Sequence, residues 1–452
     1  MSAPNSQIRI LSLNCWGLKY VAKDREKRIN AIANELGSSD YDIIGLQEIW
    51  IYADYELIRS SVASALPYSK YFYSGALGAG LAIFSKWPID SASIHPYSLN
   101  GSPLDVAGGD WFVGKGAASV IISHPELEEI EVFNTHLYAR GGESGTETHR
   151  AHRLVNAWEF AKLVRQSAAL GRYVIALGDF NSIPSSLPMQ LISSYASLVD
   201  SWEASNAAGS LNSSSTPSPL QAIRDFGITA DSPLNTYSAG KTLDAQARRY
   251  QGKRLDYIFF REPVVLKNQS RFECRESTVV FRDKVPGSNH SFSDHFGLRA
   301  VLALRTESQS AQAEQSSGPR QAIPLALDAR IIDSTLQTMI ACYRASRSRS
   351  RLHLAIFLAC IFILVPLVVG SAWLPKSWIN PIFLLFTVFV SWLGTTMLYS
   401  GFIFGHWEAN ALTSVIEEME LLRAFQGRPG GVNVHQFTTE ATEPPAETNF
   451  RS

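Results

Sequence analysis

The sequence predicts a layered α+β domain followed by a hairpin of two membrane-spanning helices. Short apolar segments alternate with helical patterns over residues 1–304, and two later segments, 352–374 and 377–407, contain no Asp, Glu, Lys or Arg. Lys+Arg (40) and Asp+Glu (41) nearly cancel, to a formal net charge of −1. This balance argues against a protein that mainly binds a polyanion, because nucleic-acid binders usually carry a basic excess.

The strand-like segments of residues 1–304 are short and rich in β-branched and aromatic residues. In chain order they read IRILSLNCW, DIIGLQE, AGLAIFS, AASVIISH, IEVFNTHL, YVIALGDF, RLDYIFF and FGLRAVLAL. Helical patterns lie between them, for example at 25–36 and 149–170. Strands and helices that mix along the whole span predict a layered α/β or α+β domain.

The four cysteines, Cys15, Cys274, Cys342 and Cys360, are scattered and form no CxxC pair. This excludes a disulfide-rich scaffold and a cysteine zinc site, and it suits a reducing compartment. The first ten residues, MSAPNSQIRI, contain no apolar core. A cleaved secretory signal is therefore not expected.

The C-terminal third is expected to hold a linker with a juxtamembrane basic segment (305–351), membrane helices at 352–374 and 381–404, and a tail (405–452) that contains an amphipathic helix. Each apolar run is long enough to cross a hydrocarbon core of ~30 Å. Four arginines precede the first helix: Arg344, Arg347, Arg349 and Arg351. The positive-inside rule then places the N-terminal domain and the tail in the cytosol.

The same arginines suit a second role, because basic residues beside a membrane attract anionic head groups with ~1 kcal/mol each. The sequence leaves open whether they bind lipid or only set the orientation. The endoplasmic reticulum is the expected membrane, with the mitochondrial outer membrane as the alternative.

Five segments end a predicted strand with a polar side chain: LNCW, LQE, NTHL, GDFN and SDHF. They contribute the candidate site residues Asn14, Glu48, His136, Asp179, Asn181, Asp294 and His295. Oxygen ligands without a thiolate suit Mg²⁺. Two histidines beside carboxylates suit the attack of water on a phosphate ester, with one imidazole as the proton acceptor.

As an ordered set, LNCWG, LQE, NTHL, GDFN, LDY and SDH resemble the endonuclease/exonuclease/phosphatase superfamily over roughly the first 300 residues. Within it, the chain is most similar to the neutral sphingomyelinases. The stretch HRAHRLVNAWE (149–159) and the two apolar helices resemble the fungal phospholipases C that act on inositol phosphosphingolipids. The resemblance implies a DNase I-like four-layered α/β/β/α sandwich of two mixed sheets, with the site at one end.

The resemblance also implies roles for individual residues. Glu48 matches the main Mg²⁺ ligand, with Asn14 beside it, and Mn²⁺ is a plausible substitute for Mg²⁺. Asp179 and Asn181 match the pair that contacts the phosphate and the attacking water, and His295 matches the general base.

Three further residues are matched in the same way. Asp294 matches the carboxylate next to the base, and Asp256 matches the acid that orients the catalytic histidine. His136 matches the second histidine, which binds the phosphate or protonates the leaving alkoxide. Two other histidines, His149 and His152, lie on a predicted helix, where we expect a surface or packing role.

Residues 109–116 fit the pattern GxxxxGK, but Gly116 follows the lysine and the next residues form a strand-like segment, so a nucleotide-binding P-loop is not expected. The neutral sphingomyelinases carry an Asp and a Lys five apart at this point, and Asp110 and Lys115 match that pair. Arg140, which follows His136 closely, is a candidate contact for an anionic head group.

The resemblance therefore implies a phospholipase C that releases ceramide and a phosphorylated head group from inositol phosphorylceramide-type lipids, from sphingomyelin, or from both. Anionic phospholipids (phosphatidylserine, cardiolipin and phosphatidylglycerol) are expected activators, and no nucleic-acid partner is expected. A membrane-anchored nuclease and an inositol phosphate phosphatase of the same superfamily are the alternatives.

Overall fold

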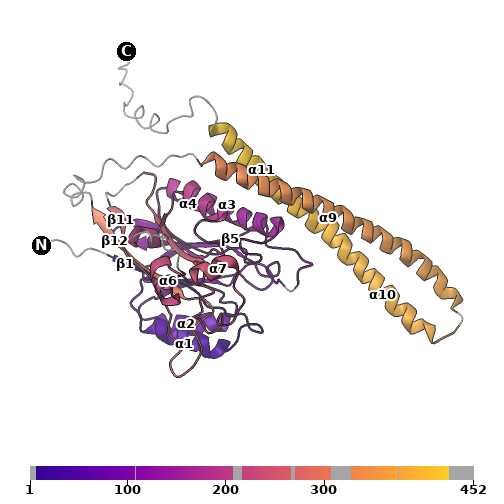
Figure 1. The fold of residues 1–452 in the computed structure, drawn as a ribbon, viewed down its shortest axis with the longest axis horizontal. Coiled ribbons are helices and arrows are strands. Elements are labelled where there is room, and N and C mark those ends of the chain that lie inside the picture. The colour runs from indigo at the N-terminus through magenta and orange to yellow at the C-terminus, as the bar shows by residue number, and fades with distance from the viewer. Residues whose placement is uncertain are drawn as a thin grey trace, which may run out of the picture.

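The computed structural model describes residues 7–106, 108–206, 216–265, 270–306, 327–374 and 376–426. Two six-stranded mixed sheets lie face to face, helices cover their outer faces, and a long helical arm projects from one side of the domain (Figure 1). The described part of the chain therefore confirms the predicted layered domain with helices at its C-terminal end.

The first sheet has the strand order β11-β12-β1-β2-β4-β3. Its central pair, β1 and β2, is parallel, and β1 pairs antiparallel with β12 on its other side. The strands are β1 (Gln7–Asn14), β2 (Ile43–Gln47), β3 (Tyr68–Phe72), β4 (Leu81–Ser85), β11 (Ser270–Val280) and β12 (Gly297–Thr306).

The second sheet has the strand order β5-β6-β7-β8-β10-β9. In its centre, His136 lies opposite Asp179 across the parallel pair β7–β8, and Asp179 lies opposite Asp256 across the antiparallel pair β8–β10. The strands are β5 (Ile89–Pro96), β6 (Gly116–His124), β7 (Glu128–His136), β8 (Tyr173–Asp179), β9 (Val199–Asp200) and β10 (Asp256–Arg261).

The period of two along each strand distributes apolar side chains between the layers. In β1, Ile10 points into the core between the sheets, and its neighbour Leu11 points toward the outer helices. Helices α1 (Arg25–Gly37) and α2 (Tyr52–Val62) cover the first sheet. Helices α3 (Glu147–Ala169) and α4 (Leu187–Ala196) cover the second. The predicted four-layered sandwich is confirmed.

Short helices lie in the loops of this sandwich: α5 (Ser201–Ser205), α6 (Pro219–Phe226) and α7 (Ala245–Tyr250). The C-terminal arm contains α9 (Ala329–Gly370), the 3₁₀ turn η2 (Ser371–Trp373), α10 (Ile379–Leu398), the π-helical turn η3 (Tyr399–Phe404) and α11 (Gly405–Gln426). Both halves of the arm, 329–373 and 379–426, are long and apolar enough to cross a membrane by length and composition.

The first helix of the arm begins at Ala329, well before the expected boundary at residue 352. The segment 305–351, expected to be a linker, is therefore helical from Ala329 onward, while 307–326 and 427–452 lie outside the described residues. The arginines lower the hydropathy of 344–351 without breaking the helix, because arginine is a good helix former.

The N-terminal part of α9 and helix α11 add a fifth layer to the sandwich. Apolar side chains of α9 and α11 join the same buried cluster as α3 and α4, among them Ile332, Met339, Leu412 and Met419. Beyond this contact the arm consists of two helices in antiparallel contact, and their outer surfaces are apolar and exposed. The arm is thus anchored by packing onto the domain.

A GxxxG pattern, Gly401 and Gly405, lies where the two halves of the arm cross. The Ser350 hydroxyl donates to the Gly401 carbonyl at 2.6 Å, and a Cβ added at Gly405 would lie 2.8 Å from the Ser350 Cβ. Small residues at this spacing let two helices approach closely. The pattern is therefore used within the chain, between α9 and the second half of the arm.

The fifth layer yields a prediction about stability. Leu412 is fully buried in the shared cluster, so Leu412→Ala should lower the free energy of unfolding by about 2–5 kcal/mol. Leu421, on the same helix and 71% exposed, is the matched control: Leu421→Ala should change it by less than about 0.5 kcal/mol. Thermal unfolding of the full-length chain in detergent, followed by near-UV circular dichroism, measures both. Equal midpoints would show that α11 is not part of the cooperative unit.

Candidate active site

The polar strand ends predicted from the sequence meet at one end of the sandwich. Asn14 ends β1, and Glu48 directly follows β2 in the first sheet. His136 ends β7 and Asp179 ends β8 in the second. These strand ends come together because both central pairs are parallel and the two sheets stack face to face.

Asp179 is the buried centre of the cluster. One carboxylate oxygen, Oδ2, accepts from the Asn14 amide at 2.9 Å and lies 3.6 Å from His136 Nε2 and 3.9 Å from His295 Nε2. The other oxygen accepts from the backbone N–H of Asn181 at 2.9 Å. Burial raises the pKa of Asp179 to about 6, against the opposing effect of His295.

Gly178 makes this arrangement possible. Its φ is +145°, and an added Cβ would lie only 2.0 Å from the Thr135 carbonyl oxygen on the neighbouring strand. Only glycine lets β7 and β8 approach so closely at their ends. The Gly-Asp pair of the GDFN segment therefore brings Asp179 beside His136.

His295 is oriented by Asp256, whose Oδ2 lies 2.8 Å from the His295 Nδ1. Burial lowers the pKa of His295, but the carboxylates of Asp256 and Asp179 raise it by more, so the pKa lies well above its usual value. The pairing leaves Nε2 directed toward Asp179. A histidine held in this way by an acid is the arrangement of an oriented general base.

Asp179, Asp256 and His295 also form a group whose ligand atoms lie within 4.8 Å of one another, which is close enough to hold a metal ion. Within this group His295 Nδ1 bonds to Asp256 Oδ2, and both oxygens of Asp179 accept hydrogen bonds from Asn14 and Asn181. The other oxygen of Asp256, Oδ1, is buried without a hydrogen-bond partner. The described residues thus contain a candidate metal-binding group, although it is not centred on Glu48.

Glu48 lies on the other side of Asn14. Its backbone is left-handed (φ +57°), and its carboxylate accepts from the Asn14 amide at 3.1 Å. Burial and the nearby Asp294 raise the pKa of Glu48 to about 7. The carboxylates of Glu48 and Asp179 lie on either side of the Asn14 amide. Such a set of oxygen donors fits a divalent cation that takes oxygen ligands. Asn14 donates to both carboxylates and so holds them on opposite sides of its amide.

Lys115 closes the site on the side of His136. Its buried ammonium forms an ion pair with Asp110 at 2.8 Å and donates to the Leu137 carbonyl at 3.0 Å. It also lies 3.2 Å from His136 Nε2, and burial and this ammonium hold the pKa of His136 well below its usual value. The chain enters β6 at Gly116 directly after the lysine. The geometry of a P-loop, which needs a helix there, is absent from this described segment.

Two further predicted residues flank the cluster. The Asn181 side chain donates to the Leu137 carbonyl at 3.1 Å, which is the same oxygen that Lys115 contacts. Arg140 forms an ion pair with Asp105, and both side chains are partly exposed. Arg140 therefore lies at the surface of the loops, outside the hydrogen-bonded core of the site.

The sequence did not predict the polar support beneath the site. Gln47 and Asn134 are fully buried and bond to each other at 2.8 Å across the two sheets. Asn134 also donates to the carbonyls of Leu46 and Ala82. Both residues belong to the motifs that carry the catalytic candidates, LQE and NTHL. Their polarity inside otherwise apolar strands is the signal that points to them.

Arg28 is a second residue that the sequence did not single out. It is fully buried and donates to the carbonyls of Cys15, Trp16 and Phe292, at 2.9, 2.7 and 3.1 Å. It thereby ties the loop after β1 to the segment that leads to His295. An arginine on the apolar face of a predicted helix was the available clue.

The comparisons with known proteins agree with this geometry. The chain is 37% identical over 430 residues to an inositol phosphosphingolipids phospholipase C of Schizosaccharomyces pombe, which covers 92% of this chain and 94% of the relative. It is 33% identical to the Saccharomyces cerevisiae protein of the same name, over 91% and 89% of the two chains. It is 29% identical to the human sphingomyelin phosphodiesterase 2, over 71% and 70%.

A family model also matches residues 11–295, a span that contains every catalytic candidate from Asn14 to His295. This match covers more than half of the chain, and the fold and the cluster of strand-end residues are consistent with it. The chain therefore belongs to the endonuclease/exonuclease/phosphatase family.

Proposed function

We propose that the chain is a Mg²⁺-dependent phospholipase C that hydrolyses phosphosphingolipids to ceramide and a phosphorylated head group. The observation that carries the proposal is the convergence of His295, His136 and the Asp179 carboxylate within 4 Å, with Asp256 behind His295. The names of the relatives, which match over most of this chain, support the lipid substrate class.

In the proposed reaction, a water molecule attacks phosphorus and the bond from phosphorus to the ceramide oxygen breaks. His295 Nε2 takes the proton of the water, and Asp256 holds the imidazole and stabilises the charge that it gains. Asp179 and Asn181 orient the water and the phosphoryl oxygens. The ceramide alkoxide leaves with a proton, so that ceramide and a phosphomonoester of the head group result.

We propose that His136 and Lys115 act at the leaving group. The low pKa of His136 keeps its imidazole neutral, and its Nε2 accepts from the Lys115 ammonium. Lys115 thus supplies positive charge beside the phosphoryl group, and the pair offers a proton to the departing alkoxide. Asp110, bonded to Lys115, holds the ammonium at this position.

Glu48 is the proposed main ligand of Mg²⁺, with Asp179 as its neighbour across the Asn14 amide. A bound Mg²⁺, or Mn²⁺ in its place, would polarise a phosphoryl oxygen and neutralise the carboxylates. Asp294 adds negative charge beside Glu48, and it completes a set of hard oxygen donors.

The helical arm supports a substrate that lies in a membrane. The Arg349 guanidinium donates to Thr148 in the first turn of α3, and this turn follows the loop that leaves β7 at the active-site end. The apolar part of α9 therefore extends beyond that end of the domain. Exposed apolar side chains on nearby loops, among them Tyr20 (91%) and Val106 (71%), lie at the same end. We infer that the active site faces the bilayer that the arm crosses.

Charge sets the proposed orientation in the membrane. Arg344 and Arg351 are exposed on α9 just before its apolar part, and the positive-inside rule then places the catalytic domain in the cytosol. The endoplasmic reticulum is the proposed membrane, with the mitochondrial outer membrane as the alternative. The near-neutral charge of the chain disfavours a nuclease of the same family.

Product analysis tests the function and its metal. The full-length protein in mixed micelles should release a water-soluble phosphorylated head group from radiolabelled inositol phosphorylceramide, from sphingomyelin, or from both. EDTA should abolish release and Mg²⁺ should restore it better than Zn²⁺.

Glu48→Gln should lose nearly all turnover and keep the unfolding midpoint, because the side chain loses the ligand's charge and keeps its volume. Full activity in EDTA, or nicking of plasmid without lipid product, would contradict the proposal.

The role of His295 predicts both a rate and a pH effect. His295→Ala should lower kcat by ~10²–10⁴-fold, as expected for a lost general base. The base must be neutral, so kcat/KM should rise with pH through the pKa of His295. Asp256→Asn removes a charge that raises this pKa, and it should shift the acidic limb to lower pH. Two results would assign the base to another residue. One is an acidic limb of the kcat/KM profile that stays at the same pH in Asp256→Asn, and the other is more than a tenth of the wild-type rate in His295→Ala.

Anionic phospholipids (phosphatidylserine, cardiolipin and phosphatidylglycerol) are the proposed activators. Replacement of Arg344, Arg347 and Arg351 by Gln should weaken activation on vesicles of rising anionic content and leave membrane insertion intact. Arg349 is kept, because it pairs with Glu408. At ~0.5 M salt the wild type should lose the same activation, since salt screens exposed charges. An unchanged response of the triple variant would limit the arginines to setting orientation.

A further inference from the structure

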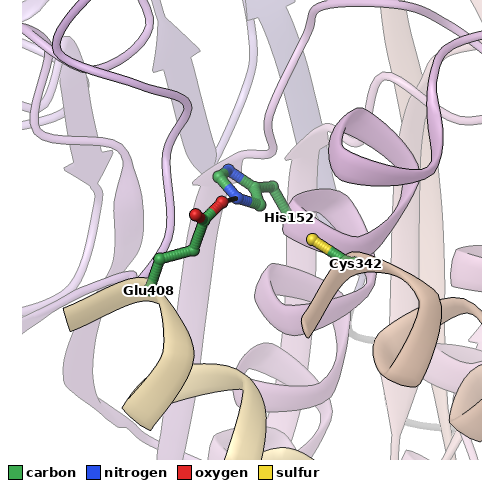
Figure 2. Close-up of side chains that lie close together, drawn as sticks. All are labelled: His152, Cys342 and Glu408. Carbon is green, nitrogen blue, oxygen red and sulfur yellow. Dashed lines mark hydrogen bonds and ion pairs between the residues drawn. The ribbon is translucent and has the colours of Figure 1, made fainter. Parts of the chain in front are cut away.

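A buried polar cluster joins the helical arm to helix α3 of the catalytic domain. Glu408 of α11 and His152 of α3 are both nearly inaccessible, and Nε2 of His152 lies 2.9 Å from the Glu408 carboxylate (Figure 2). From α9, Ser346 donates to the same carboxylate at 2.6 Å, and Arg349 contacts both of its oxygens at 2.8 Å. Three helices therefore meet at one carboxylate.

The other nitrogen of His152 fixes the direction of these bonds. Nδ1 accepts from the backbone N–H of Gly101 at 2.9 Å, so it carries no proton in this contact. The ring proton is then on Nε2, which donates to Glu408. His152 thus relays the position of Glu408 to the backbone of Gly101.

Cys342 lies beside this pair, and the ligand atoms of His152, Cys342 and Glu408 are within 4.8 Å of one another (Figure 2). A metal ion is nevertheless a poor occupant. Both nitrogens of His152 are engaged, and the Arg349 guanidinium already neutralises the carboxylate. The cluster is complete as a set of hydrogen bonds, which indicates a structural link.

Gly101 belongs to the connection between β5 and β6, which also carries Asp110 and Lys115. A Cβ added at Gly101 would lie 3.7 Å from the Asp110 Cβ, so the Gly101 backbone packs directly beside Asp110. One helical turn beyond His152, Asn156 donates to the Leu99 carbonyl at 2.8 Å. The start of the connection is therefore held against α3 next to the Asp110–Lys115 pair.

The second half of the arm contacts the same connection at two other points. The Trp407 indole N–H donates to the Ser98 carbonyl at 2.8 Å. Trp111, the neighbour of Asp110, packs edge-on against Tyr399 with 6.4 Å between ring centroids. Tyr399, Trp407 and Glu408 of the arm thus all support the connection that leads to Lys115.

We propose that Glu408 is a positioning residue for the active site: through His152 it holds the β5–β6 connection in the conformation that places Lys115 against His136. The arm would then complete the catalytic site as well as attach it to a membrane. The inference rests on the proposed function only for its effect on turnover, because the effect on the backbone is independent of substrate.

Hydrogen exchange of the full-length protein in detergent tests the structural part without any substrate. Glu408→Gln should raise the exchange of the β5–β6 connection, most of all at Gly101. Glu418 provides a matched control, because it lies on the same helix and bonds to Trp158 and Lys162 of α3 without reaching the connection. Glu418→Gln should leave that exchange unchanged. Equal exchange in wild type and Glu408→Gln would overturn the proposal.

A kinetic cycle tests the catalytic part. Glu408→Gln should lower kcat by roughly 2- to 30-fold with little change in KM. In a Lys115→Ala background the same substitution should cost less than about 2-fold, because the residue that it positions is already gone. The same factor in both backgrounds would indicate general destabilisation and would overturn the proposal.

Trp407→Phe is the substitute variant if Glu408→Gln fails to fold. Trp407 is exposed, and the substitution removes its hydrogen bond to the Ser98 carbonyl. It should raise exchange at the start of the connection, and unchanged exchange would count against the proposal. Failure of the wild type to hydrolyse either sphingolipid would remove the proposed function, and the exchange result would stand.

Discussion

The buried carboxylate of Asp179 is the constraint on which the rest of the site depends. A charge in this position must be met by hydrogen-bond donors, and the Asn14 amide and the Asn181 backbone N–H supply them. Nε2 of His136 and Nε2 of His295 also lie within 4 Å of this carboxylate. This demand explains the glycine before it, which lets β7 and β8 close up. The register of β8 against β10 sets Asp256 opposite Asp179, and in this position Asp256 lies behind His295.

Much of this site could be predicted from the sequence, because strand ends carry local signals. A polar residue that terminates an apolar segment is visible without a structure, and parallel strands bring such residues to one edge. The contact of Lys115 with His136 could not be predicted in this way, since it depends on how a long connection folds back. The start of α9 at Ala329 was missed for another reason: charge lowers hydropathy, and hydropathy alone says little about helix boundaries.

The arm has two physically different parts. Its outer part exposes apolar side chains on all sides, which suits a bilayer. Its inner part buries Met339, Leu412 and Met419 with α3 and α4, so it behaves as a layer of the globular domain. Arg349 marks the change between the two. Arg344 and Arg351 remain exposed, while the Arg349 guanidinium pairs with Glu408 and donates to Thr148.

Apolar packing alone would hold the arm with little directional preference, because helices can shift along one another by a turn with similar burial. A buried carboxylate adds direction. An ion pair in the interior contributes little net stability, since desolvation offsets the attraction, but removal of one partner is costly. Glu408 finds its donors from Ser346, Arg349 and His152 at only one register of α11 against α9 and α3. The polar cluster therefore selects one docking geometry of the arm, and the backbone of Gly101, bonded to His152, follows that selection toward the active site.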